Sequence, residues 1–154
     1  MNRSFAAAGT ALEDHVRLHP LDPMYRAVFA DGSVGLLKMY RHPLGAYFWE
    51  AARGFVDAGE HTSDAAVREL REETGLVSAR IAPLGIITPE ASTIVARVAL
   101  FAALDCTAAS GRLEDEPGLG GLQMFTRDEA AAMTGDGRIE DATTLLSLYR
   151  YLAL

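Results

Sequence analysis

Stretches of apolar residues with the spacing of β-strands recur along the chain. They cover residues 24–30, 34–40, 46–50, 78–88, 94–105 and 122–125. Asp31 and Gly32 separate the first two stretches, and this dipeptide is typical of the tight turn of a β-hairpin. Pro83 restricts the fourth stretch to a sheet edge or to an irregular portion of a strand, because proline cannot donate a ladder hydrogen bond. The fifth stretch is long and almost continuously apolar, which predicts a buried central strand.

Three other segments have the periodicity of amphipathic helices. They cover residues 63–74, 127–133 and 141–152. In the first helix, Thr62 or Ser63 is the expected N-cap and Gly75 is the expected C-terminal stop. The stripe expected to face the core consists of Ala66, Val67 and Leu70.

The two later helices carry signals of their own. Thr126 and Glu129 have the spacing of a capping box at the start of the second helix. The apolar side of the third helix consists of Leu145, Leu148, Tyr149 and Leu152. Strands, an inserted helix, further strands and two final helices predict an α/β fold, an α/β/α sandwich in which helices cover a mixed β-sheet.

The composition is that of an ordinary globular domain. We treat residues 1–154 as one domain, with an irregular N-terminal extension over residues 1–23. The formal net charge of −7 argues against nucleic acid or an anionic membrane as the main partner. The single cysteine, Cys106, is expected to be a buried packing residue. With no signal-peptide pattern and no apolar stretch of about 18 residues, we expect a cytoplasmic protein.

Three carboxylates share one stripe of the first predicted helix. Glu69, Glu72 and Glu73 have the i, i+3, i+4 spacing, and Arg68 is expected to reach only Glu72. Each like-charge pair at this spacing costs roughly 0.2–0.5 kcal/mol, so something must compensate the carboxylates. Oxygen ligands that converge from one face suit a hard divalent cation such as Mg²⁺ or Mn²⁺. The alternative is a solvated acidic helix face.

The sequence around this stripe resembles the Nudix box, Gly-x5-Glu-x7-Arg-Glu-U-x-Glu-Glu-x-Gly-U, where U is a bulky aliphatic residue. Every fixed position is matched, by Gly54, Glu60, Arg68, Glu69, Leu70, Glu72, Glu73, Gly75 and Leu76. The resemblance implies the Nudix-type α/β/α sandwich with a loop–helix–loop metal site. It further implies an enzyme that hydrolyses a nucleoside diphosphate linked to another moiety.

The same resemblance implies roles for the box residues. Glu69 and Glu73 bind the metal most directly, aided by Glu72 and by the backbone carbonyl of Arg53. Arg68 orients a glutamate. Losing Glu72 or Glu73 is expected to remove most activity while the fold stays intact.

Three other box positions are assigned less directly. Gly54 and Gly75 are expected to be structural, because glycine adopts backbone conformations closed to other residues. Glu60 is either a carboxylate near the metal or a solvated loop acid.

Segments outside the box are similar to the ADP-ribose pyrophosphatase branch of this family. They are residues 39–45, 48–50, 53–54 and 137–145. The sequence departs from that branch at Met39, where the branch has glutamine, and at Ala52, where it usually has proline. These departures concern the nucleotide preference rather than the pyrophosphate chemistry.

Candidate substrate-binding residues lie just before the box. Arg41 could clamp a phosphate through its planar guanidinium, and Glu50 belongs to the same neighbourhood. Trp49 or Tyr47 could stack on a nucleobase, although aromatic residues in an apolar strand are usually part of the core.

The general base is sought in the polar, glycine-rich loop of residues 107–121. In the ADP-ribose branch a glutamate on a loop well past the box fills this role, which makes Glu114 and Glu116 the candidates here, with Asp115 beside them. The alternative is a solvated acidic loop tip. Glu90, in the preceding loop, is the reserve candidate.

Together these features predict a hydrolase that depends on Mg²⁺ or Mn²⁺ and acts on a small nucleotide, with a homodimer left open. The expected substrate is ADP-ribose or a nucleotide sugar, cleaved to AMP or another nucleoside monophosphate and a sugar phosphate. One alternative is a hydrolase of nucleoside triphosphates or dinucleoside polyphosphates. An alternative of another class is a Nudix-fold regulator that binds a nucleotide without cleaving it, against which the intact carboxylate cluster argues.

Overall fold

A computed structural model describes residues 22–28, 31–92, 96–109 and 118–154. The strands are β1 (Asp22–Val28), β2 (Val34–Arg41), β3 (Ala46–Glu50), β4 (Ala52–Arg53), β5 (Leu76–Val77), β6 (Arg80–Ile87), β7 (Val98–Leu104), β8 (Thr107–Ala108) and β9 (Leu119–Phe125). The helices are α2 (Thr62–Thr74), α3 (Arg127–Gly135) and α4 (Ala142–Leu152). The first strand begins at Asp22, and the other residues of the expected N-terminal extension, 1–21, lie outside the described part.

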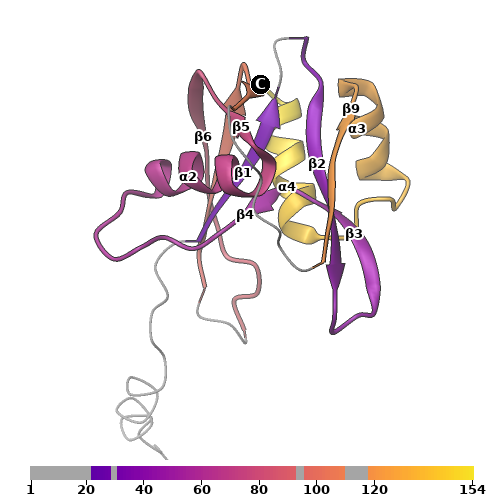
Figure 1. Ribbon diagram of the computed structural model, residues 1–154. Coiled ribbons are helices and arrows are strands. Elements are labelled where there is room, and N and C mark those ends of the chain that lie inside the picture. Colours follow the sequence, from indigo (N-terminus) through magenta and orange to yellow (C-terminus); the bar gives the residue numbers. More distant parts are fainter. Residues whose placement is uncertain (1–21, 29–30, 93–95, 110–117) are drawn as a thin grey trace, which may run out of the picture.

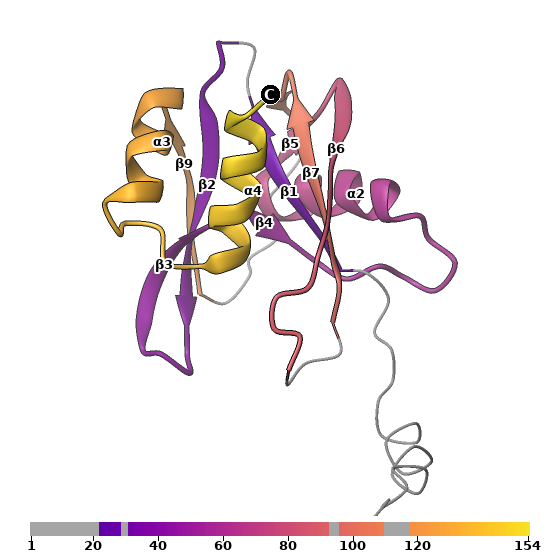
Figure 2. The ribbon, with the colours of Figure 1, turned by 180° about the vertical axis from the view of Figure 1, so that it is seen from behind.

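A mixed, seven-stranded sheet forms the middle layer. Its strand order is β3-β2-β1-β7-β6, with β4 paired to β1 and β9 paired to β2. The pair β1–β7 is parallel and the other pairs are antiparallel. Helix α2 covers one face, and α3 and α4 cover the other (Figures 1 and 2). This confirms the predicted α/β/α sandwich.

Turn and edge signals lie where the sequence predicted them. Asp31 accepts a hydrogen bond from the Ser33 backbone N–H at 2.9 Å, and Gly32 has a φ of +81°. Strand β6 lies at the edge of the sheet, with a register shift between Pro83 and Gly85. Strand β7 lies between β1 and β6 and is buried over nearly its whole length, as expected of a central strand.

Helix α2 begins at Thr62, one residue earlier than predicted. Its N-cap is His61, which makes no side-chain capping bond, so the expected capping role of Thr62 or Ser63 was wrong. The His61 carbonyl instead accepts from the backbone N–H groups of Asp64 and Ala65 at 3.0 Å. The predicted stop at the C-terminus is confirmed, because the residue after Thr74 is a glycine in the left-handed conformation.

The buried stripe of α2 is shifted from the predicted one. Its members are Ala65, Ala66, Leu70 and Thr74. Val67 is 42% exposed. Successive residues of an α-helix are rotated by about 100°, so the side chain of Val67 points away from the face that Ala66 buries. The stripe packs on apolar residues of β2 and β7, among them Leu37 and Phe101.

The two later helices pack together on the opposite face. The capping box of Thr126 and Glu129 is confirmed, with both reciprocal hydrogen bonds present. In α4, Leu148 is buried as predicted, whereas Tyr149 is 54% exposed. The buried side of α4 consists of Thr143, Thr144, Ser147, Leu148 and Tyr151.

Cys106 is buried, as expected, and donates its S–H to the Ala103 carbonyl at 3.2 Å. In the described part of the chain, no helix is long and apolar enough to cross a membrane.

Candidate active site beside helix α2

The loop before α2 packs tightly against the helix at Gly54. A Cβ atom added to Gly54 would lie 1.9 Å from the Glu69 carboxyl carbon. Only glycine therefore allows the strand end and the Glu69 carboxylate to approach this closely, which gives a physical reason for a glycine at the first box position.

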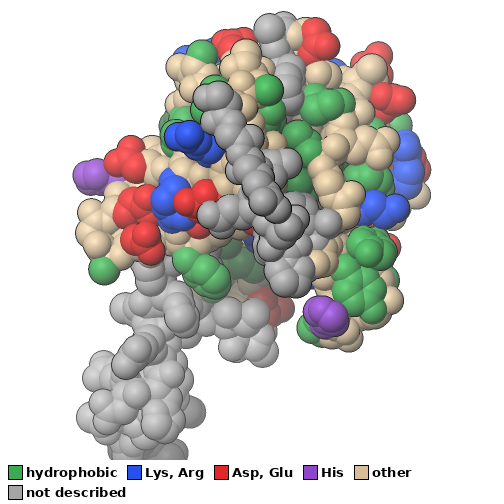
Figure 3. Space-filling view, viewed as in Figure 1, with side chains coloured by type: hydrophobic (Ala, Val, Ile, Leu, Met, Phe, Trp, Pro, Cys, Tyr) green, Lys and Arg blue, Asp and Glu red, His purple; other side chains and the backbone are tan. Residues whose placement is uncertain are grey.

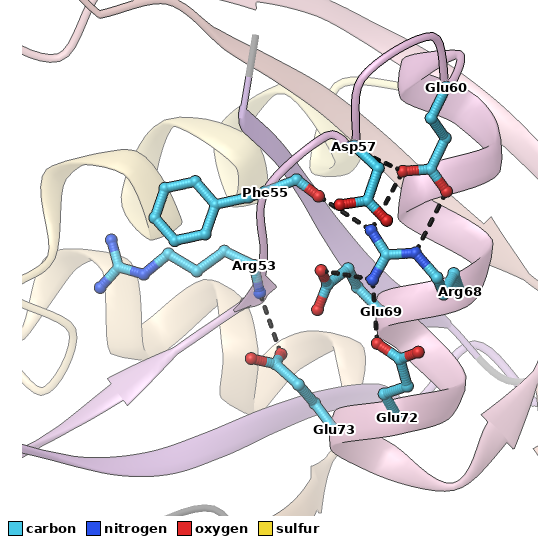
Figure 4. Close-up of polar contacts among 8 residues, drawn as sticks. All are labelled: Arg53, Phe55, Asp57, Glu60, Arg68, Glu69, Glu72 and Glu73. Carbon is cyan, nitrogen blue, oxygen red and sulfur yellow. Dashed lines mark hydrogen bonds and ion pairs between the residues drawn. The ribbon is translucent and has the colours of Figure 1, made fainter. Parts of the chain in front are cut away.

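Arg68 binds several acidic groups of the box at once (Figure 4). It donates to both carboxylate oxygens of Glu60 at 3.1 Å, to Glu69 Oε1 at 2.8 Å and to Glu72 Oε2 at 2.9 Å. Its Nη2 also donates to the Phe55 carbonyl at 2.9 Å. The expectation that Arg68 reaches only Glu72 was wrong, because helix spacing ignores the loop that folds back to bring Glu60 and Phe55 alongside.

These contacts compensate the charge of the acidic stripe. Figure 3 shows acidic side chains around a basic one on the side of the molecule where α2 lies. The pKa of Arg68 is raised, first by its hydrogen bonds to Glu60 and then by Glu69 and Glu72. The pKa of Glu60 is lowered, first by Arg68 and then by the Asp57 backbone N–H. Arg68 thus offsets the predicted like-charge repulsion between Glu69 and Glu72, two of the three carboxylates of the stripe.

Glu73 faces a different partner. Its Oε2 accepts a hydrogen bond from the Arg53 backbone N–H at 3.0 Å, so the end of β4 fixes this carboxylate. The side chain of Arg53 points away from the α2 glutamates (Figure 4). The backbone of Arg53 therefore contacts the carboxylate cluster, while its side chain extends to the opposite side of β4.

The donor set fits a hard divalent cation, but its carboxylates are held apart by internal partners. Among the described residues, no three His, Cys, Asp or Glu side chains converge as a ready metal site. Arg68 holds Glu69 and Glu72, and the Arg53 backbone holds Glu73. Mg²⁺ and Mn²⁺ prefer oxygen ligands, and the carboxylates of this helix stripe supply them. Gly54, which carries no side chain, leaves room beside the Glu69 carboxylate. Arg68 binds one oxygen of each carboxylate, Glu69 Oε1 and Glu72 Oε2, and a cation would bind through the other oxygen of each.

A pocket of about 380 Å³ lies next to Arg53. It is lined by Arg41, Pro43, Leu44, Phe48, Glu50, Arg53, Glu140, Asp141 and Ala142. Sequence reasoning placed Arg41 and Glu50 here but missed Phe48, Glu140 and Asp141. Glu140 and Asp141 could have been predicted, because they lie in the segment 137–145 that is similar to ADP-ribose pyrophosphatases.

A buried carboxylate organises the arginines of this pocket. Glu50 is only 2% exposed. Arg41 donates to its two oxygens, from Nε at 2.8 Å and from Nη2 at 2.5 Å, and Arg53 also donates to Oε2. Arg53 Nη1 lies 3.8 Å from Asp141 Oδ1, an ion pair too long to be a hydrogen bond.

The N-terminus of α4 is tied to the sheet at the pocket. The Ala51 backbone N–H donates to the hydroxyl of Thr144, a fully buried residue, at 3.0 Å. Asp141 caps the helix by accepting from the Thr144 backbone N–H at 2.7 Å. Ile139, two residues before the cap, is buried in the core. These contacts place Glu140 and Asp141 at the pocket.

The aromatic residues of β3 divide between its two faces. Trp49 packs edge-to-face on Phe125, with ring centroids 5.2 Å apart, which favours its core interpretation. Tyr47 is 57% exposed and lies against Tyr40. Neither residue lines the pocket, whereas Phe48 does, because successive side chains of a strand point to opposite faces.

The predicted general-base candidates Glu114 and Glu116, with Asp115, lie outside the described residues. Glu90 is described, and it accepts hydrogen bonds from the Ser92 hydroxyl and backbone N–H. These bonds lower the pKa of Glu90, first through the hydroxyl, which makes this carboxylate a weaker base.

Comparison with known proteins gives consistent matches. A family model described as the NUDIX domain matches residues 25–146. The chain is 25% identical over 147 residues to an ADP-ribose pyrophosphatase of Bacillus subtilis, covering 95% of this chain and 79% of that protein. It is 32% identical over 100 residues to a mouse ADP-sugar pyrophosphatase, covering 64% of this chain and 46% of that protein. A nudix hydrolase of Caenorhabditis elegans is 50% identical over 46 residues, 30% of this chain and 21% of that protein. The matched part thus spans less than half the length of the mouse and worm proteins.

Solved structures give the same fold. An ADP compounds hydrolase superposes with a TM-score of 0.73 at 22% identity, covering 84% of this chain and 69% of that one. A NUDIX hydrolase from Nitrosomonas europaea superposes with a TM-score of 0.67 at 18% identity, covering 86% of this chain and 88% of that one.

Proposed function

This chain belongs to the Nudix family, and from that premise we propose that it hydrolyses the pyrophosphate bond of a nucleoside diphosphate derivative. The proposed substrate is ADP-ribose or a nucleotide sugar, with AMP or another nucleoside monophosphate and a sugar phosphate as products. Mg²⁺ or Mn²⁺ is the proposed cofactor. Relatives named ADP-ribose and ADP-sugar pyrophosphatases support this substrate class.

The observation that carries the proposal is the junction at Arg53. Its backbone N–H binds Glu73 of the carboxylate cluster, while its side chain lines the pocket beside Arg41 and Glu50. A diphosphate needs a charge-neutralising site and an adjacent site for the group it carries. The two sites are contiguous here, joined by one residue.

Glu69, Glu72 and Glu73, with the Arg53 carbonyl, would hold the cation. When bound, a divalent cation neutralises phosphate charge and lowers the pKa of bound water. Arg68 fixes the orientation of Glu69 and Glu72 through its hydrogen bonds. Acting through these carboxylates, it is a positioning residue.

Other residues bind the substrate and move the proton. Arg41 is held by Glu50 with its guanidinium at the pocket, where it can contact a phosphate. Phe48 offers the pocket an aromatic surface. Glu114 or Glu116 is proposed to accept the proton of the attacking water, because carboxylates that neutralise a cation are poor bases.

The test is hydrolysis of ADP-ribose by the purified chain with Mg²⁺ or Mn²⁺, with the products identified by chromatography. AMP and ribose 5-phosphate are expected, and EDTA should abolish their formation. Glu73→Gln should lose at least about a hundredfold in kcat while keeping the folded spectrum. Asp64→Asn, an exposed acid on the same helix, is the matched control and should stay active. Faster turnover of triphosphates than of ADP-ribose would contradict the substrate assignment, and binding without any turnover would indicate a regulator.

A further inference from the structure

Phe55 presents an uncovered aromatic ring beside the candidate active site. The residue is 68% exposed. Its backbone is nevertheless fixed, because Gly54 packs against Glu69 and the Phe55 carbonyl accepts from Arg68 Nη2 at 2.9 Å. The ring points away from the α2 glutamates (Figure 4). A ring that is held in place in this way leaves apolar surface that the described residues do not bury.

The exposed ring lies close to the beginning of β1. Strands β1 and β4 are antiparallel, with Met24 opposite Arg53. Continued by two residues, this register brings Phe55 opposite Asp22. Figures 1 and 2 agree with this placement, since the chain that leaves β4 passes beside the beginning of β1. Residues 1–21, which join the sheet at Asp22, therefore enter the molecule next to Phe55.

Residues 1–21 are long enough and apolar enough to cover the ring. Neighbouring strands lie about 5 Å apart, which sets the scale of the distance from Asp22 to Phe55. Leu18 precedes Asp22 by four residues, and an extended chain of that length spans roughly 13 Å. Val16 and Leu18 alternate with polar residues, so both can face one side of an extended segment. That apolar side can reach Phe55 when the chain turns back on itself.

Charge favours this segment over a second copy of the chain as the group that covers the ring. Residues 1–21 contain two arginines, one glutamate and one aspartate, which gives a formal charge of zero. A second copy carries the full formal charge of −7. It would also bring the carboxylates around Arg68 toward their own counterparts, which like-charge repulsion opposes.

We propose that residues 1–21 fold back on the same chain and pack on Phe55, with Val16 and Leu18 in contact with the ring. Burial of these apolar surfaces against each other supplies the driving force. Because Arg68 binds the Phe55 carbonyl, the contact would brace the loop that holds Arg68 beside the carboxylate cluster. The inference is independent of the proposed function, since it concerns packing and not the substrate.

Photocrosslinking of the full chain tests which group covers the ring. Phe55 is replaced by the photoreactive analogue p-benzoylphenylalanine, and the crosslinked peptides are identified by mass spectrometry after irradiation. Crosslinks to residues 1–21 within a single chain are expected. The same analogue at Tyr149 is the matched control, because Tyr149 is also exposed, at 54%, and belongs to the end of α4 remote from the beginning of β1 (Figures 1 and 2). It should give no crosslink to this segment.

A thermodynamic cycle tests the named contact. Phe55→Ser should lower the melting temperature by roughly 4–8 °C when the ring is covered, whereas loss of a ring that stays exposed should change it by less than about 2 °C. The double variant Val16→Ser, Leu18→Ser should lower the melting temperature by a similar amount. Combining all three substitutions should lower it little further, because the two sides of one contact are not independent.

The outcomes separate the possible occupants of this surface. Crosslinks between two chains would overturn the inference and assign the surface to a second copy. The absence of any crosslink from position 55 to residues 1–21 would also overturn it. So would melting-temperature changes that simply add in the combined variant, because they would show that Phe55 does not contact Val16 and Leu18.

Discussion

Among single residues, Arg68 sets the charge balance around α2. It holds Glu60 from the loop and Glu69 and Glu72 from the helix, and it also binds the Phe55 carbonyl. A cation entering the cluster would take over part of this role. Metal and Arg68 would therefore both balance the charge of the same carboxylates, and loss of Arg68 would leave more of that charge to the metal.

Replacing Arg68 should expose this relation. Arg68→Ala is expected to lower the free energy of unfolding in EDTA by about 1–3 kcal/mol, because carboxylates lose charged hydrogen-bond partners. Added Mg²⁺ should raise the melting temperature more in this variant than in the wild type. Arg71→Ala, at an exposed position of the same helix, should change neither quantity appreciably. An identical Mg²⁺ response in all three proteins would show that Arg68 does not act as the counter-charge.

Glu50 is the most buried charge of the pocket. Glu50→Gln keeps the size of the side chain but leaves Arg41 and Arg53 without their shared carboxylate. We expect a loss of roughly 2–3 kcal/mol in unfolding free energy by urea titration, below the full effect of a broken buried pair because both arginines are partly exposed. Glu140→Gln, in the same pocket but exposed, should stay within about 0.5 kcal/mol of the wild type. Similar losses in both variants would refute the organising role of Glu50.

At the scale of elements, the position of α4 depends on its tether to the sheet. Thr144→Val removes the hydroxyl that accepts from the Ala51 backbone N–H, leaving a buried donor unpaired. The expected cost is about 1–3 kcal/mol, with a higher KM for ADP-ribose and a smaller change in kcat. Thr134→Val, which removes a hydroxyl bonded within α3, is the control. An unchanged KM in a destabilised Thr144→Val protein would mean that the tether supports the fold but not the pocket.

The capping box of α3 should give stability that depends on pH. Hydrogen bonds from the Thr126 backbone and then its side chain lower the pKa of Glu129 below its ordinary value of 4.5. A lowered folded-state pKa stabilises the protein above the unfolded-state pKa, and this stabilisation is lost as the pH falls through the folded-state pKa. Glu129→Gln should therefore reduce stability at neutral pH, and by less at a pH below the lowered folded-state pKa. Denaturant titrations at both pH values measure this, and a constant difference between the proteins would contradict it.

At the scale of the whole molecule, the site combines segments from both halves of the chain. Strands β2 to β4 supply the arginines, α2 the carboxylate cluster, and the start of α4 the outer acids of the pocket. The described residues on either side of the segment with Glu114 and Glu116 are also anchored near the site. Strand β8 pairs with β5, directly after the C-terminal stop of α2, and the Gly118 carbonyl accepts from the Tyr40 backbone N–H at 2.8 Å.

These anchors motivate the prediction for the general base. Glu114→Gln or Glu116→Gln should lower kcat for ADP-ribose by about a hundredfold, with little change in Mg²⁺ affinity, because a base acts on the proton and not on the metal. Asp115→Asn, in the same loop, is the comparison. Unchanged kcat in all three variants would remove this loop and direct the search to Glu90 or to the box.

Local chemistry was readable in the sequence because its causes lie within a few residues. The hairpin turn at Asp31-Gly32, the edge strand with Pro83, the stop at Gly75 and the capping box at Thr126 follow from backbone freedom and short-range hydrogen bonds. Periodicity located the helices but misjudged how they face the core. Val67 and Tyr149 are exposed, since the position of a helix on the sheet decides which edge of an apolar stripe is covered.

The sequence by itself determined the family, through the spacing of the box residues, and the fold that goes with it. Only the tertiary structure decided which side chains the charged and polar residues of the site bind. Arg68 binds Glu60 because a loop folds back, and Thr144 binds Ala51 across 93 residues of sequence. Glu140 and Asp141 line one pocket with Arg53 only because α4 returns to the end of β4. Charge pairing depends on distance in space, and sequence spacing predicts that distance only within one helix or strand.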